Sequence, residues 1–185
     1  MNQAIARPSP AKLLVPALLG AAIALALGVY GNVHDPTGRS IFSLVFTKTI
    51  NMKAWFATAA ATLALFQLYS GLRIYGRVPF PRTMPGWFAS AHRASGTLAF
   101  LITLPVAYHC LWALGFQDYS TRVLIHSIAG CFFFGAFAAK VVIVEWRSLP
   151  GYALPIAGGL VFTVLIVIWL TSALWFFQNF GFPQF

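Results

Sequence analysis

The chain has 185 residues, of which 59% are hydrophobic and 8% are charged, and its mean hydropathy is +0.79. This balance lies outside the range of soluble domains and predicts an integral membrane protein with no separate soluble module. The net charge of +9 does not indicate a nucleic-acid partner, because the basic residues are spread along the flanks of apolar segments instead of forming one patch.

Five apolar segments are long enough to cross a hydrocarbon core about 30 Å thick as single helices. They are residues 13–31, 54–72, 87–114, 122–144 and 153–177. We therefore predict one all-α membrane domain over residues 1–185, with five transmembrane helices, of which the last four form the core. The basic residues before the first segment are also compatible with a cleaved secretory signal, although the length of its apolar run favours a retained helix.

The positive charges at the ends of these segments predict an orientation. The side that would hold the N-terminus carries Arg7, Lys12, Arg73, Arg77, Arg82, Arg93, Lys140 and Arg147, and the other side carries Arg39, Lys48, Lys53 and Arg122. The positive-inside rule then places the N-terminus in the cytoplasm and the C-terminus outside. We expect the membrane to be the inner (plasma) membrane of a bacterial cell.

Ionisable side chains interrupt the apolar pattern of the third and fourth segments, at His92, His109, His126 and Lys140. Such groups are costly at membrane depth and mark a candidate functional site. His109 and His126 lie at similar distances on either side of the 115–121 turn, so two antiparallel helices would hold them at the same depth. Two facing histidines with no further ligands suit the two axial positions of a haem b iron.

Two glycines are compatible with this prediction. Gly96 follows His92 by one helical turn, and Gly130 follows His126 in the same way. A missing side chain at these positions would leave room for a flat macrocycle. The alternative is that both glycines only allow close packing between helices.

His92 lies near the opposite membrane surface and cannot share a haem with His109. A second haem there would need an unusual ligand or one from a partner chain. Alternatively, His92, Arg93 and Lys140 would form a cationic site for propionates, a quinone head group or an anionic membrane lipid.

The run Leu124-Ile125-His126-Ser127-Ile128-Ala129-Gly130 resembles the LHSWLG-type signature of the cytochrome b-561 family, with Ile128 in place of the tryptophan. The resemblance covers about residues 53–177 and implies transmembrane electron transfer through two haems b, each held by two histidines on different helices. The motif implies that His126 is a haem ligand. This chain has three core histidines where the family has four, so one histidine ligand for the second haem is missing. The chain is also similar to short uncharacterised actinobacterial membrane proteins, which implies no activity.

The two cysteines give weaker evidence for a functional site. Cys110 and Cys131 lack the Cys-x-x-Cys-His spacing of covalent haem attachment and are interpreted as small buried hydrophobes. A zinc site formed by His109, His126 and Cys110 is the alternative, but no acidic partners for it are visible in the sequence.

Two functions of different class follow. The first is an electron-transfer or oxidoreductase subunit, in which one haem b held by His109 and His126 receives electrons from a quinol or an inner donor and passes them to an outer acceptor, such as a redox partner protein. In this function His92 or Lys140 would contact the quinone. The second is a haem-free accessory or anchor subunit of a larger membrane (respiratory) complex, whose histidines form hydrogen bonds between helices.

Overall fold

The computed structural model describes residues 10–40, 42–146 and 148–182, and this part of the chain is helical and contains no strand. Two of the basic residues used to predict the orientation, Arg7 and Arg147, lie outside the described residues. The five long helices are α1 (Leu14–Val33), α2 (Thr49–Ile74), α3 (Phe88–His109), α4 (Thr121–Glu145) and α5 (Ala153–Trp169). The shorter elements are the 3₁₀ turn η1 (Pro10–Leu13), the π-helical turns η2 (Cys110–Leu114) and η3 (Leu170–Leu174), and α6 (Trp175–Phe180).

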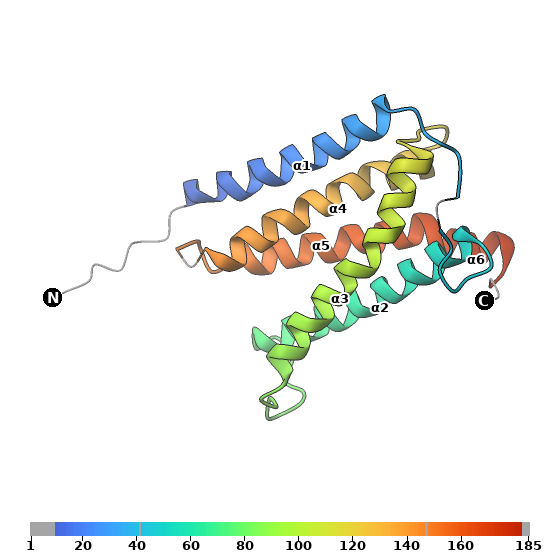
Figure 1. The fold of residues 1–185 in the computed structure, drawn as a ribbon. Helices are drawn as coiled ribbons and strands as arrows, with labels where there is room; N and C mark the ends of the chain where they lie inside the picture. Colours follow the sequence, from blue (N-terminus) through green and yellow to red (C-terminus); the bar gives the residue numbers. More distant parts are fainter. Residues whose placement is uncertain (1–9, 41, 147, 183–185) are drawn as a thin grey trace.

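The five long helices run up and down in chain order (Figure 1). One end of the bundle carries the start of α1 together with the 75–87 and 146–152 connections, and we call it the 75–87 end. The other end carries the 34–48 and 115–120 connections together with α6, and we call it the 115–120 end. This arrangement agrees with the predicted all-α membrane fold. The side of the membrane that each end faces stays a prediction.

Four helical stretches are long and apolar enough to cross a membrane: Pro10–Val33, Phe88–Leu114, Thr121–Glu145 and Ala153–Phe180. The chain is therefore a multi-pass membrane protein. The remaining predicted span falls within α2, whose 26 residues give a length of about 39 Å at about 1.5 Å per residue. This helix is long enough to span but less apolar, because it carries polar side chains such as Lys53, Gln67 and Ser70.

The packing order of the helices differs from their chain order. Helix α4 packs between α1 and α5, while α2 packs between α3 and α5. Helices α1 and α4 approach each other closely, because a Cβ added to Gly20 would lie 2.7 Å from the carbonyl oxygen of Gly135. Helix α3 makes little direct backbone contact with α4, and it leans away from α4 toward the 75–87 end (Figure 1).

Side chains fill the middle of the space between α3 and α4. Phe100 of α3 stacks on Phe137 at 4.0 Å between ring centroids and meets Phe134 edge-on at 5.8 Å. These rings border the buried core, which consists of Ala60, Ala64, Ala129, Phe133, Val164 and Leu165. Nearer the 115–120 end, the space between the helices is not filled.

Candidate functional site: a cavity at the 115–120 end

A cavity of about 310 Å³ lies among α2, α3, α4 and α5 at the 115–120 end of the bundle. Its volume falls within the range of roughly 300–1,000 Å³ that is usual for ligand sites. Most of its wall is apolar, and small residues on three helices widen it: Ala54, Ala57, Ala107 and Gly130. The polar groups that reach it are few and therefore informative.

Both π-helical turns border this cavity. The turn η2 contributes Cys110, Leu111 and Leu114, and the turn η3 contributes Thr171, Ser172 and Ala173. Single π turns inside α-helices occur frequently at functional sites. Here the α3–η2 and α5–η3 helices each change their winding where they meet the cavity.

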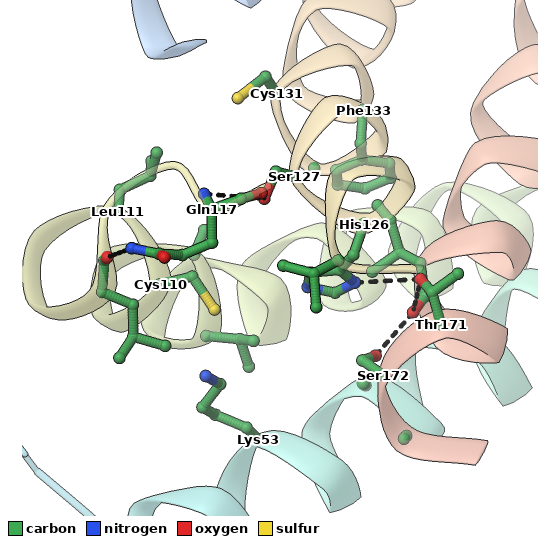
Figure 2. Close-up of a pocket in the computed structure, with 18 of the residues that line it drawn as sticks. Lys53, Cys110, Leu111, Gln117, His126, Ser127, Cys131, Phe133, Thr171 and Ser172 are labelled. Atoms are coloured by element: carbon green, nitrogen blue, oxygen red, sulfur yellow. Dashed lines mark hydrogen bonds between the residues drawn. The ribbon is translucent and has the colours of Figure 1, made fainter. Parts of the chain in front are cut away.

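The hydrogen bonds around His126 define which ring nitrogen is free. Its Nδ1 lies 3.1 Å from Thr171 Oγ1, and that hydroxyl lies 2.7 Å from the Val167 carbonyl oxygen. A carbonyl only accepts, so the single hydroxyl proton goes to Val167 and the hydroxyl accepts the proton of His126 Nδ1. In the neutral imidazole, Nε2 then carries the lone pair. Figure 2 shows this second nitrogen on the side of the ring that faces Cys110.

Cys110 and Lys53 approach the same space from the opposite side. Figure 2 shows the thiol of Cys110 on the side of the cavity that faces His126, with the ammonium group of Lys53 directed toward this thiol. The thiol is close enough to interact electrostatically with both His126 and Lys53. A nucleophilic sulfur, an imidazole lone pair and a cation thus meet in a largely apolar cavity.

Arg122 is a second cation in the cavity wall. Its Nη1 donates a hydrogen bond to the Thr171 carbonyl oxygen at 2.6 Å, and its guanidinium lies over the Trp175 ring at 3.8 Å. None of the described residues that line the cavity is acidic. The two cations therefore favour a ligand that carries negative charge.

The structure does not bring His109 and His126 together across the cavity. The described lining includes His126 and Cys110 but not His109. His109 is 8% exposed, and its Nδ1 is buried without a hydrogen-bond partner among the described residues. The predicted haem pair therefore faces the cavity through one of its two members.

The two predicted glycines have different surroundings. Gly130 lines the cavity, and a Cβ added to it would meet nothing within 4 Å, so open space lies beside this turn of α4. A Cβ added to Gly96 would lie 2.9 Å from Gln67 Oε1. The absence of a side chain at Gly96 thus makes room for an amide of α2.

His92 lies toward the 75–87 end, between α2 and α3. Its Nδ1 is 2.7 Å from Ser70 Oγ, which in turn donates to the Phe66 carbonyl oxygen at 2.6 Å. The same reasoning assigns the proton to Nδ1 and the lone pair to Nε2. The side-chain amide of Gln67 also donates to the main-chain carbonyl of His92, which fixes this part of α3 on α2.

The other predicted residues at this end are Arg93 and Lys140. Arg93 is exposed, and Lys140 is half-buried on α4, within electrostatic range of His92. Arg93 and Lys140 thus place positive charge near His92.

Several functional candidates were not anticipated from the sequence. In the sequence, Lys53 indicates only a flanking charge, Cys110 enters only as a small hydrophobe or as a ligand of the alternative zinc site, and Thr171 carries no predicted role. The sequence does carry one signal, since Thr171-Ser172 is a hydroxyl pair within the otherwise apolar segment 153–177. A hydroxyl at membrane depth often bonds across helices.

Comparison with known proteins gives one result. A protein-family model described as a family of unknown function (DUF6529) matches residues 13–184, a range that includes every residue of the cavity. No curated protein and no solved structure matches the chain. Inferences about function therefore depend on the site itself.

Proposed function

The chain belongs to the DUF6529 family of unknown function, and from its own site we propose that it is a membrane-embedded b-type cytochrome that carries electrons. In this proposal the cavity at the 115–120 end holds one haem b, with His126 as an axial ligand. A haem, when bound, supplies an iron centre that accepts and releases one electron.

The observation that carries the proposal is the hydrogen bond between His126 and Thr171. Histidines that ligate a metal almost always donate their other ring N–H to a fixed acceptor, which sets both the tautomer and the ring orientation. Thr171 Oγ1 is that acceptor here, 3.1 Å from Nδ1, and it is itself held by the Val167 carbonyl. Nε2 is thereby presented to the cavity as a ligand.

The shape and charge of the cavity support the same proposal. A flat apolar macrocycle needs walls without bulky side chains, and Ala54, Ala57 and Gly130 provide such walls. The acidic propionates of a haem need cationic partners, and Lys53 and Arg122 line the cavity. A haem iron would need a second ligand from the protein, and His109 and Cys110 lie at the junction of α3 and η2, where Cys110 lines the cavity.

The 75–87 end suits a quinol as the electron donor. Oxidation of a quinol releases protons together with electrons, so a proton acceptor must lie near its head group. His92 has its Nδ1 proton committed to Ser70, which leaves Nε2 available to accept a proton. Lys140 and Arg93 add positive charge for the head group or for anionic lipid. We further propose the bacterial inner membrane, an N-terminus in the cytoplasm and a redox partner protein as acceptor at the 115–120 end.

The experiment that tests the proposal is a count of haem per chain. The full-length protein, expressed with a haem supply and purified in mild detergent, should give sharp reduced-minus-oxidised visible bands and one haem per chain in the pyridine haemochrome assay. His126→Ala should lose the haem. His92→Ala is the matched control, because His92 lies between α2 and α3 toward the 75–87 end and does not line the cavity.

Two results would contradict the proposal. A folded wild-type protein without visible absorption would favour the haem-free accessory or anchor subunit instead. Undiminished haem in His126→Ala, with the control variant also unchanged, would remove His126 from the site.

A further inference from the structure

We propose that Cys110, and not His109, supplies the axial ligand opposite His126, so that a thiolate and an imidazole hold the haem. This inference rests on the proposed function, because it concerns the second ligand of the same haem. It follows from the helical phase of α3 and η2, from the contacts that fix this phase, and from the charges beside the thiol.

The cavity-facing positions of α3 and η2 follow helical spacing. Thr103, Val106, Ala107, Cys110, Leu111 and Leu114 line the cavity. These positions recur every three or four residues, which is the pattern of one helix face. Cys110 lies in the middle of this face. His109 lies about 100° further round the helix, and the described lining does not include it.

Hydrogen bonds to backbone groups hold this helix end in its present rotation. The carbonyl of Trp112 lies 3.1 Å from His34 Nε2, and the carbonyl of Ala113 accepts from the N–H of Gly38 at 2.9 Å. Just beyond, the N–H of Phe116 donates to the carbonyl of Gly31 at 2.6 Å. Turning the helix by one residue to bring His109 into the cavity would break these bonds to α1 and the 34–38 segment. Cys110 needs no such rotation.

A cation lies beside Cys110 in the cavity wall. Lys53 lines the same cavity, and its ammonium group lies beside this thiol (Figure 2). A cysteine that binds a metal does so as a negative thiolate, which a neighbouring ammonium group stabilises. Ligation replaces the S–H bond with a bond from sulfur to iron and releases one proton to the solvent, with no change in oxidation state.

A thiolate ligand would change what the carrier can do. It donates more electron density than an imidazole, and the identity of the axial ligands sets the haem reduction potential. The proposed pair therefore predicts a lower potential than the pair His109 and His126 would give. The Cys110→His variant should then keep its haem, raise the midpoint potential and show a spectrum of two imidazole ligands.

The test compares three variants of the full-length, haem-loaded protein: Cys110→Ser, His109→Ala and Thr163→Val. Thr163 is exposed on α5 and does not line the cavity, so Thr163→Val is the control. We expect Cys110→Ser to change the visible and electron paramagnetic resonance spectra of the ferric protein, and the other two to leave them unchanged. We also expect a maleimide to label Cys110 in haem-free protein and not in haem-loaded protein. Size-exclusion profiles show whether each variant is folded.

The outcomes separate the two proposals. If His109→Ala changes the spectra while Cys110→Ser does not, His109 is the ligand and this inference fails, although the haem site stands. If both variants keep the wild-type spectra, neither residue is the ligand and the inference fails as well. If folded wild-type protein binds no haem at all, the proposed function fails and the inference falls with it.

Discussion

Replacing Thr171 with valine removes one hydroxyl and almost no volume from the wall of the cavity. His126 Nδ1 then loses the acceptor at 3.1 Å that fixes its proton, and the ring is free to rotate or to exchange tautomers. Loss of such a second partner typically weakens metal binding ~10–100-fold, which corresponds to about 1.4–2.8 kcal/mol. We therefore expect the Kd for haem to rise by roughly that factor.

The assay is a titration of haem into haem-free protein in detergent, followed by the absorbance of the bound form. Thr171→Ser should bind like the wild type, because it keeps an acceptor oxygen. Thr163→Val is the matched control on the same helix, since Thr163 is exposed and its hydroxyl bonds only to the Gly159 carbonyl at 2.9 Å. A Thr171→Val protein that binds haem as tightly as the Thr163→Val protein would refute the tautomer argument.

Three further variants test the cavity and the packing around it. Gly130→Leu should abolish haem binding in the same titration, because the new side chain would fill the open space beside α4. Gly159→Leu is the control and should bind haem normally, because a Cβ at Gly159 also meets nothing within 4 Å but this residue does not line the cavity. Gly135→Ala should destabilise the protein by ~1–3 kcal/mol in detergent unfolding, because its Cβ would overlap the Gly20 carbonyl; unchanged stability would contradict the close approach of α1 and α4. Ser70→Ala should lower the free energy of unfolding by about 0.6–1.7 kcal/mol in the same assay, because the Nδ1 proton of His92 would lose its acceptor. A loss of stability smaller than that of a Thr163→Val control would count against this hydrogen bond.

The membrane fold could be predicted because hydropathy reports it directly. The predicted segments 13–31, 87–114, 122–144 and 153–177 match, to within one residue, stretches of helix that are apolar enough to span. The segment 54–72 also lies in a helix, but the structure extends that helix back to Thr49 and so includes Lys53. A charge that appeared to flank the span is therefore part of the helix that borders the cavity.

The identity of the cavity-facing residues could not be predicted, because it depends on how α3 packs. Helical spacing places His109 and Cys110 on different faces, but it does not say which face meets α4. The sequence suggested that neighbouring helices α3 and α4 pack directly, which would favour two facing histidines. In the structure α3 packs on α2 and leaves a space toward α4. This tilt, together with the bonds that hold η2, exposes Cys110 to the cavity.

The two intramembrane histidines that are held by hydroxyls differ in what surrounds their free nitrogens. His126 borders a cavity with small residues in its wall, whereas His92 lies where α2 and α3 pack closely, with its Cε1 3.7 Å from the position of a Cβ on Gly71. The same hydrogen-bond device thus presents one lone pair to an open volume, whereas the other belongs to a ring held between two packed helices. A macrocycle needs the first environment, while a proton acceptor for a quinol needs only access for one head group. This contrast is why we propose one haem at His126 and a quinol contact at His92, and why one haem per chain, not two, is the expected count.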